Sequence, residues 1–281
     1  MNESHRTKKP VTALRVDAHV HIRAPEALGV AAAAGITALR DAGTKQGSGL
    51  TVGRQRNERS GVTCLSAGWA LCKQGGYGAH FGVPVKTRED IASEIQRLKQ
   101  AGADIIKVMA SGMVSLTDPG GITPGGFSRE ELGFIVAHAA AAGLAVMAHA
   151  NGETAIVDAV EAGVRSVEHG FFMTEQALEK MARGAVFWVP TVRALARAME
   201  ERGAAGEARA FTLSLISAHQ AMLVSAHAMG VPLAIGTDCV LPATGYKEEY
   251  EAELTYFEHA GLSQEIVEKI ACEGGALLLG I

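Results

Sequence analysis

Short apolar segments alternate with longer helical patterns along almost the whole chain, and this alternation limits the fold more than any other feature. Eight of the short segments are predicted to be strands: Arg15–His21, Ile36–Asp41, Val62–Ala67, Asp104–Ala110, Ala145–Ala150, Ser166–His169, Val186–Pro190 and Pro232–Asp238. They are apolar through most of their length, as are the strands of a parallel sheet that is covered on both faces. The pattern therefore predicts strand–helix units repeated in series.

The helical patterns between these strands are clearest at Arg88–Gln100, Ser128–Ala142 and Glu207–Met229. Ser128 and Glu131 have the spacing of a capping box, in which a side chain and a backbone N–H at the start of a helix satisfy each other. We therefore expect a helix to begin directly after Ser128.

The number of units and the chain length together favour one architecture. Eight strand–helix units in 281 residues match a closed (β/α)8 barrel of the TIM type, an α/β fold of one domain. We expect residues 13–281 to form this barrel and residues 1–12 to form a polar N-terminal tail. A doubly wound open sheet is the alternative fold.

Charge and cysteine content narrow the function classes. With 30 acidic and 26 basic residues, the net charge is −4, so a nucleic-acid or anionic-membrane footprint is not expected. The four cysteines are too scattered for a disulfide framework, which favours a reducing compartment. The polar start of the chain has no apolar core like that of a signal peptide, and we expect a soluble cytoplasmic protein.

Polar residues alternate on the first predicted strand. Asp17, His19 and His21 are two positions apart, and side chains with that spacing point to the same face of a strand. Two histidines on the inner face of a barrel strand favour a metal or catalytic site. A pair of hydrogen-bonded core histidines is the alternative.

Four further polar residues lie on the later strands. Lys107 lies within the fourth strand, and His149, His169 and Asp238 lie at or near the ends of the fifth, sixth and eighth strands. A buried lysine cation is costly unless it is paired or chemically modified, although a lysine that reaches solvent or forms a buried ion pair is the alternative. Histidine and aspartate at the carboxyl ends of barrel strands predict a site for zinc or another transition metal.

The combined pattern resembles the amidohydrolase superfamily, in its prolidase-like branch that is related to the imidazolonepropionases. The resemblance runs from about Val16 to Ile281 and rests on these matching stretches: Asp17–His21, Thr37–Gly43, Ala103–Gly112, Ala148–Asn151, Ser166–Gly170 and Ala234–Asp238. It implies two divalent metal ions, typically zinc, and a CO2-derived carbamate on Lys107 that bridges them.

The resemblance also implies a role for each ligand. His19, His21 and Asp238 would hold the deeper ion, and His149 and His169 would hold the more exposed one. A hydroxide between the two ions would be the nucleophile. Asp238 would be the catalytic residue that moves the proton from the attacking water to the leaving amine.

Two departures from the family pattern stand out, of which the first bears on packing and oligomerisation and the second on the substrate. The small β-sandwich of the family is expected to be missing, because few residues precede the first strand and the chain stops near Leu278. Many relatives have Gly-Gly-His-Gly where this chain has Gly75-Gly76-Tyr77-Gly78. The identity of the substrate therefore cannot be transferred from the family.

Three residues are predicted to contact the substrate. Tyr77 and His80 lie in the glycine-rich loop, and Arg193 follows the seventh strand, where its guanidinium could hold a carboxylate through two hydrogen bonds. A surface position for His80 and a solvated first-turn position for Arg193 are the alternatives.

Six more polar residues are predicted to have structural or surface positions. Arg40 and Asp41 are expected to form a buried ion pair with each other beneath the site. The other histidines of helical segments are expected at the surface: His138, His219, His227 and His259.

The resulting hypothesis is a metal-dependent hydrolase that cleaves the amide bond of a small substrate, such as a dipeptide or an N-acyl amino acid with a free carboxylate. A lactonase or esterase on the same two-metal site is one alternative, and a barrel that binds without catalysis is another. The expected partner is a small-molecule substrate, and binding to nucleic acid or to a membrane is not expected. The chain could form a homo-oligomer.

Overall fold

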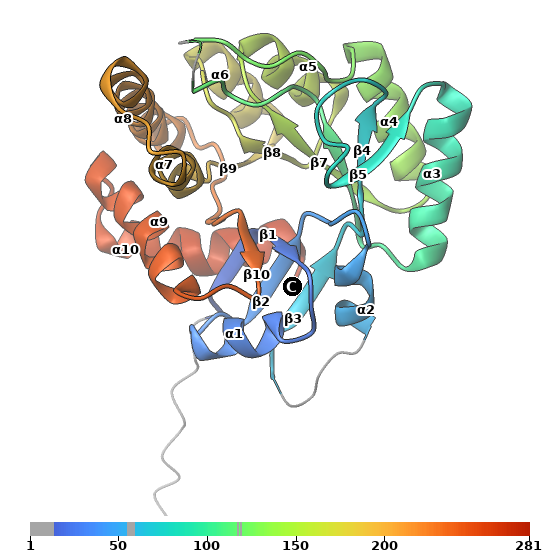
Figure 1. Cartoon of the computed structure of the whole chain (residues 1–281), viewed down its shortest axis with the longest axis horizontal. Helices are drawn as coiled ribbons and strands as arrows, with labels where there is room; N and C mark the ends of the chain where they lie inside the picture. The colour runs from blue at the N-terminus through green and yellow to red at the C-terminus, as the bar shows by residue number, and fades with distance from the viewer. Residues whose placement is uncertain (1–13, 55–59, 117, 119) are drawn as a thin grey trace, which may run out of the picture.

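Parallel strands and helices alternate along the protein in a computed structural model that describes residues 14–54, 60–116, 118 and 120–281 (Figure 1). The predicted tail, residues 1–12, lies outside these residues. The strands are β1 (Val16–Ile22), β2 (Ala38–Asp41), β3 (Thr63–Ser66), β4 (Ala70–Lys73), β5 (Gly82–Val85), β6 (Ile105–Met109), β7 (Ala145–Ala150), β8 (Ser166–His169), β9 (Phe187–Val189) and β10 (Cys239–Leu241). The helices are α1 (Ala27–Ala33), α2 (Ser48–Arg54), α3 (Arg88–Ala101), α4 (Arg129–Ala141), α5 (Glu153–Ala162), α6 (Glu175–Gly184), α7 (Val192–Glu201), α8 (Gly206–Ala228), α9 (Tyr246–Ala260), α10 (Gln264–Lys269), a π-helical turn (Ile270–Gly274) and α11 (Gly275–Leu279).

The strands form two sheets in which neighbouring strands are parallel. One sheet has the order β10-β1-β2-β3 and the other has the order β5-β4-β6-β7-β8-β9. Backbone hydrogen bonds join the two sheets on both sides. On one side, the Asp104 N–H donates to the Ser66 carbonyl at 2.9 Å. On the other side, the segment 232–238 lies between β9 and β1, where the Ala234 N–H donates to Trp188 and the Ala18 N–H donates to Ile235.

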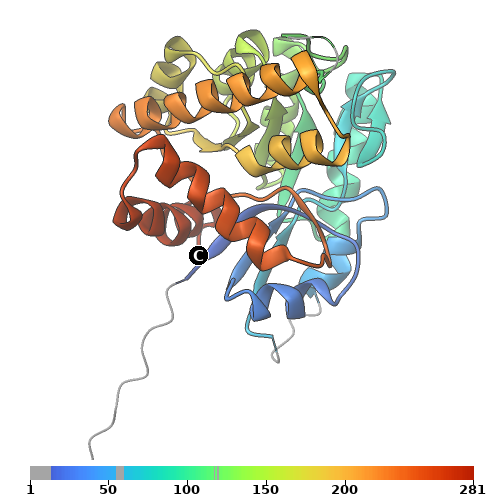
Figure 2. The same ribbon diagram turned by 60° about the vertical axis from the view of Figure 1, so that its left-hand side comes forward.

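These contacts close the strands into a barrel, which confirms the predicted α/β barrel fold. Helices cover its outer surface, and Figure 2 shows α8 and α9 lying beside each other there. The main apolar core fills the layer between helices and strands, with Leu39, Ile106 and Trp188 among its fully buried side chains. Among the described residues, no helix is both long enough and apolar enough to span a membrane.

The three helices predicted most clearly are confirmed as α3, α4 and α8. Helix α4 begins at the predicted capping box, in which Ser128 accepts from the Glu131 N–H and the Glu131 carboxylate accepts from the Ser128 N–H. Helix α3 has a second box of this kind, formed by Thr87 and Asp90. Each cap satisfies N–H groups that have no partner inside the helix.

The eighth predicted strand, Pro232–Asp238, is wrong in its boundaries. Only Leu233 of this segment forms an isolated bridge, to Trp188, and the regular strand β10 begins at Cys239. The chain passes so close to β1 and β9 that a Cβ on Gly236 would lie 2.4 Å from the Val189 side chain and 2.8 Å from that of His19. Asp238 has a φ of 53°, a left-handed backbone that interrupts strand geometry.

The third predicted strand is followed by two strands that the apolar pattern did not indicate. Gly68, with a φ of +71°, interrupts the extended chain between β3 and β4. Strand β5 then returns beside β4, and a Cβ on Gly82 would lie 2.0 Å from the Ala70 carbonyl oxygen. This arrangement places the predicted substrate loop, Gly75–Gly82, between β4 and the start of β5.

Candidate metal centre

The polar residues predicted on different strands lie near one end of the barrel. His19 and His21 project from β1, Lys107 from β6, His149 from β7 and His169 from the end of β8. The ring centroids of His19 and His169 are 5.0 Å apart, and those of His149 and His169 are 4.6 Å apart. The carboxyl ends of barrel strands thus bring together side chains that are far apart in sequence: His169 is 150 positions after His19.

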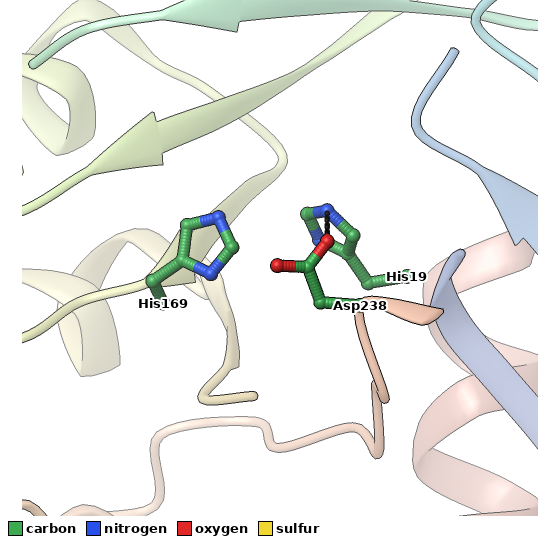
Figure 3. A group of neighbouring side chains, drawn as sticks. All are labelled: His19, His169 and Asp238. Carbon is green, nitrogen blue, oxygen red and sulfur yellow. Dashed lines mark ion pairs between the residues drawn. The ribbon is translucent and has the colours of Figure 1, made fainter. Parts of the chain in front are cut away.

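Asp238 lies between histidines of both sheets. Figure 3 shows its carboxylate between the rings of His19 and His169. One carboxylate oxygen, Oδ1, is 3.2 Å from His21 Nε2 and 3.5 Å from His19 Nε2. His19, His169 and Asp238 each offer a ligand atom within 4.8 Å of the others, so these three residues could hold a metal ion.

Each of the four imidazoles makes a hydrogen bond away from this centre with one ring nitrogen. Nδ1 of His19 lies 2.7 Å from the Glu168 carboxylate and Nδ1 of His169 lies 2.7 Å from the Thr191 hydroxyl. Nδ1 of His21 contacts the Gly43 carbonyl, and Nε2 of His149 contacts the Gly112 carbonyl at 3.0 Å. A ring nitrogen that donates to oxygen leaves the other ring nitrogen with its lone pair free, which is the form that binds metals.

The free nitrogen of His19 is notable because it is buried. His19 Nε2 makes no hydrogen bond to any described residue, and an unpaired buried polar atom is costly. A cation bound between His19 and Asp238 would satisfy both this nitrogen and the carboxylate. The donor set, imidazole nitrogen with carboxylate oxygen, suits zinc and similar ions.

The carboxylate that orients His19 is itself held by a buried network. Arg40 donates to Glu168 at 2.9 Å, to the Ser166 hydroxyl at 2.8 Å and to the Ala18 carbonyl at 2.6 Å. Burial alone would raise the pKa of Glu168, but Arg40 and His19 lower it to about 2. Glu168 is therefore a carboxylate near neutral pH, and it fixes the proton of His19 on Nδ1.

Lys107 is a buried amine without an anionic contact. Its exposed fraction is 1%, and it makes no hydrogen bond or ion pair within the part of the chain that the structure describes. Burial lowers its pKa to about 8, although Glu168 and Asp238 partly oppose that effect. A larger fraction of its amine is therefore unprotonated near neutral pH than for an ordinary lysine.

Burial and neighbouring charges also shift the pKa values of other side chains of the site. Burial lowers the pKa of His19 to about 4 and that of His149 to about 3, with the charge of Lys107 adding to both effects. Burial would raise the pKa of Asp238, but the contact with His21 and the nearby rings hold it well below its usual range. Near neutral pH these two histidines are neutral and Asp238 is an anion, which are the protonation states of metal ligands.

Backbone strain is concentrated at the same site. His169, Thr191 and Asp238 have φ values of 66°, 50° and 53°, in a left-handed region that non-glycine residues seldom adopt. Such strain persists only where surrounding contacts hold it, and it is common at functional sites. Here Trp188 Nε1 donates to the His169 carbonyl, and the Asp238 N–H donates to the His19 carbonyl, both at 2.8 Å.

A cavity of about 90 Å³ adjoins the centre, and His149, His169 and Asp238 contribute to its lining. Tyr77 also lines it, with its ring centroid 5.1 Å from that of His149. His80 is exposed and is not part of the lining. The lining also excludes Arg193, whose guanidinium pairs with Glu200 at 2.8 Å and Glu249 at 2.9 Å.

Two structural predictions are corrected. Arg40 and Asp41 do not pair with each other: Arg40 pairs with Glu168, while the Asp41 carboxylate accepts from the Ile22 N–H and the Ser66 hydroxyl. They are adjacent on β2, so their side chains leave the strand on opposite sides.

His219 is buried rather than at the surface. It packs against Phe171 and Trp188, with centroid distances of 4.4 and 4.9 Å. His227 and His259 are exposed, as predicted, and His138 is half-buried against Phe134.

Sequence reasoning missed the groups that orient the ligands, above all Glu168 and Thr191. A signal for Glu168 was present, because an acidic residue within the buried run Ser166–His169 needs a cation and Arg40 lies in another buried strand. Thr191 gave no comparable signal, since its contact with His169 depends on its left-handed backbone.

Comparison with known proteins agrees with this geometry. The model of the amidohydrolase family matches residues 15–281. Ochratoxinase of Aspergillus niger is 31% identical over 235 residues, which cover 73% of this chain and 48% of that protein. The chain thus spans about half the length of this curated relative.

Solved structures with the same fold include two peptidase relatives. A Xaa-Pro dipeptidase with bound methionine is 23% identical with a TM-score of 0.81, and the match covers 96% of this chain and 75% of that one. A prolidase complexed with N-methylphosphonate-L-proline is 27% identical with a TM-score of 0.76, over 96% of this chain and 74% of that one. The family match over nearly the whole chain, together with a barrel whose strand ends gather histidines and an aspartate, shows that the chain belongs to the amidohydrolase family.

Proposed function

We propose that this chain is a metal-dependent hydrolase that cleaves the amide bond of a small substrate, such as a dipeptide or an N-acyl amino acid. One observation carries the proposal: four neighbouring imidazoles each have one ring nitrogen engaged by an outer hydrogen bond, and the other nitrogens of His19 and His21 lie 3.5 and 3.2 Å from the Asp238 carboxylate. The ochratoxinase, dipeptidase and prolidase relatives support it at the level of reaction class.

Six residues would hold two divalent ions, most simply zinc: His19, His21, Lys107, His149, His169 and Asp238. Bound ions would supply Lewis acidity at the substrate carbonyl and lower the pKa of a water molecule. Glu168, Gly43, Gly112 and Thr191 would keep the imidazoles in the required tautomers through the hydrogen bonds described above.

Lys107 would act as a carbamate. Its neutral amine adds to CO2 with loss of one proton, which converts a buried base into an anion with two oxygen ligands. This step would replace a buried amine that has no anionic partner by a group that neutralises part of the charge of two cations. The burial of Lys107 beside the histidines supports the assignment.

Asp238 would be the group that moves the proton. Its carboxylate faces the open cavity and is half-buried, with 26% of the side chain exposed. It would accept a proton from the attacking water and return it to the leaving amine.

The cytoplasmic location and the absence of nucleic-acid and membrane partners expected from the sequence remain predictions.

Elemental analysis and a substrate screen test the function together. Protein purified without chelator should carry about two divalent ions per chain and hydrolyse members of a panel of dipeptides and N-acyl amino acids. Chelation should abolish this activity, and added zinc should restore it. Protein that neither retains nor regains metal would contradict the proposal, and hydrolysis confined to lactones or esters would favour the alternative reaction.

The carbamate has its own test. Protein equilibrated with ¹³C-bicarbonate should show a carbamate carbonyl resonance by NMR that is absent from Lys107→Ala. The variant should also lose bound metal, and a short carboxylic acid added in solution should partly restore it. A wild-type spectrum without the resonance, in metal-loaded protein, would refute the bridging role.

A further inference from the structure

The cavity beside the candidate metal centre is apolar over most of its wall. Met113, Val114 and Leu116 line it after β6, Phe171 lines it after β8, and Leu195 lines it from α7. Charged lining groups are few: within the described residues they are Asp238, beside the histidines, and Arg202. A ligand that fills the cavity must therefore present apolar surface between two charged ends.

Helix α7 connects those two ends. Its N-cap residue, Thr191, contacts His169, and its C-cap residue is Arg202. Ala194, Leu195 and Ala198 line the cavity between them, at a spacing that places them on one face of the helix. The helix advances about 1.5 Å per residue, so the backbone of Arg202 lies roughly 12 Å along the axis from Ala194.

Hydrogen bonds hold the start of α7 in place, because both carboxylate oxygens of Glu253 accept backbone N–H groups there. The Val192 N–H lies 3.0 Å and the Arg193 N–H lies 2.7 Å from Glu253. Glu253 is fully buried in α9. This anchor fixes the direction in which α7 leaves the candidate metal centre.

Three arginines of this region differ in their partners. Arg193 is paired with Glu200 and Glu249, and Arg197 is paired with Glu249 and also donates to the Asp238 carbonyl at 2.8 Å. Arg202 makes no ion pair or side-chain hydrogen bond with any described residue, is exposed, and lines the cavity. It is therefore the arginine of α7 that can pair with an anion on a bound ligand.

We propose that Arg202 and the apolar face of α7 form a substrate subsite for amides in which an apolar chain or ring separates the scissile bond from an anionic group. This inference rests on the proposed amide hydrolysis and adds the shape and charge of the substrate. It replaces the sequence-based expectation that Arg193 holds a carboxylate directly next to the cleaved bond, because Arg193 already has two carboxylate partners.

Two acetylated amino acids with different spacing test the subsite. In N-acetylglycine the carboxylate is next to the amide, whereas in N-acetyl-ε-aminocaproate a five-methylene apolar chain separates them. We expect metal-loaded wild type to have the higher kcat/KM for the aminocaproate. Arg202→Met should raise KM for it by about tenfold, as for loss of a charge-assisted hydrogen bond at an exposed rim, while leaving kcat and the kinetics of N-acetylglycine unchanged.

Matched controls separate charge from packing. The methyl ester of N-acetyl-ε-aminocaproate should be a poor substrate to the same degree in wild type and Arg202→Met. Arg209→Met, which removes an exposed arginine of α8 outside the cavity lining, should behave as wild type. Ala198→Leu should narrow the cavity at its apolar wall and lower kcat/KM for the aminocaproate more than for N-acetylglycine. A wild-type preference for N-acetylglycine, or an unchanged KM in Arg202→Met, would overturn the subsite.

Equilibrium binding distinguishes failure of the subsite from failure of the proposed function. Calorimetric titration of N-acetyl-ε-aminocaproate into chelator-treated protein requires no turnover. If wild type hydrolyses no amide but binds this ligand about tenfold more tightly than Arg202→Met does, the subsite holds and the hydrolase proposal fails. Equal binding by the two proteins would overturn the subsite whatever the enzyme hydrolyses.

Discussion

The side chain of Glu168 determines which nitrogen of His19 is available to a metal ion. Glu168→Gln would exchange an acceptor for a group that can also donate, and it would weaken the hold on the Nδ1 proton. Loss of such an outer partner typically costs about 10- to 100-fold in metal affinity. We therefore expect a weaker zinc affinity of that size, measured by competition with a chromophoric chelator.

The variant also leaves the Arg40 guanidinium buried without its carboxylate, so a second protein is needed. Arg40→Met combined with Glu168→Gln removes both charges, and it should recover stability to denaturant without recovering zinc affinity. Wild-type zinc affinity in either protein would show that Glu168 does not orient His19.

Asp238 is the residue whose charge matters most for turnover. Asp238→Asn keeps nearly the same shape and can retain much of the metal, but an amide cannot accept the proton of the attacking water. We expect kcat to fall by at least ~10²-fold, the usual scale for loss of a general acid–base group. Metal content measured on the same samples serves as the control, and near wild-type turnover would assign proton transfer to another group.

The inward-facing side chains of the site could be predicted from the sequence. The groups that hydrogen-bond to those side chains and orient them could not. Strand alternation placed His19 and His21 on one face, and their side chains do approach Asp238 together. Contacts such as Thr191 with His169 depend on left-handed backbone conformations that no residue pattern indicates. The pairing of Arg193 with Glu249 could not be predicted for a similar reason, since Glu249 lies on α9, whose position relative to α7 follows only from the fold.

Among the elements, most strands and the clearest helices could be predicted, because apolar runs and capping boxes act locally. The segment 232–238 could not, because its course depends on a close approach to two other strands. Gly236 permits that approach, as a side chain there would overlap Val189 and His19. Strands β4 and β5 escaped prediction because they are short and lie on either side of a glycine-rich turn.

Helix α7 depends on a buried acid, and this dependence should be visible in the pH dependence of stability. Burial raises the pKa of Glu253 to about 8, although the N–H groups of Val192 and Arg193 oppose that effect. Glu253 thus binds its proton more tightly in the folded protein than in the unfolded chain. Its contribution to stability is complete below the unfolded pKa of about 4.3 and is lost as the pH rises toward 8.

Glu253→Gln carries no charge at any pH, so it should remove this trend. The free energy of unfolding of wild type minus that of Glu253→Gln should fall as the pH is raised from about 5 to about 8, measured by urea denaturation of chelator-treated proteins. Glu258→Gln changes an exposed residue of the same helix and should show no such trend. A pH-independent difference between wild type and Glu253→Gln would mean that Glu253 titrates normally.

For the whole molecule, the candidate ligands belong to both sheets. His19 and His21 lie on β1 of the four-stranded sheet, whereas Lys107, His149 and His169 lie on β6, β7 and β8 of the six-stranded sheet. Metal ions bound at this centre would join the two sheets through side chains, in addition to the backbone hydrogen bonds between them. Metal should accordingly stabilise the entire barrel rather than only the loops around the site.

Thermal and urea unfolding with and without zinc test this expectation. A ligand that binds only the folded state, at a free concentration of about 100 times its Kd, adds about 2.7 kcal/mol to the free energy of unfolding. We expect a single cooperative transition that shifts upward as a unit on zinc addition in wild type. Zinc should shift the unfolding transition of Lys107→Ala less than that of wild type. If zinc leaves the unfolding transition of wild type unchanged, the six residues do not form a metal centre.

The double attachment of helix α7 has a consequence for how this protein can acquire new substrates. The same ten-residue helix forms the cavity wall and, through Thr191, supports His169. Substitutions on its inner face that tilt it to admit a larger molecule would also displace an imidazole, so they would trade selectivity against metal retention. The loop that carries Met113, Val114 and Leu116 supports His149 through the backbone carbonyl of Gly112, which side-chain substitutions at those three positions leave in place. Adaptive change and laboratory evolution should therefore accumulate first in that loop, with α7 changing only after compensating substitutions around Glu253.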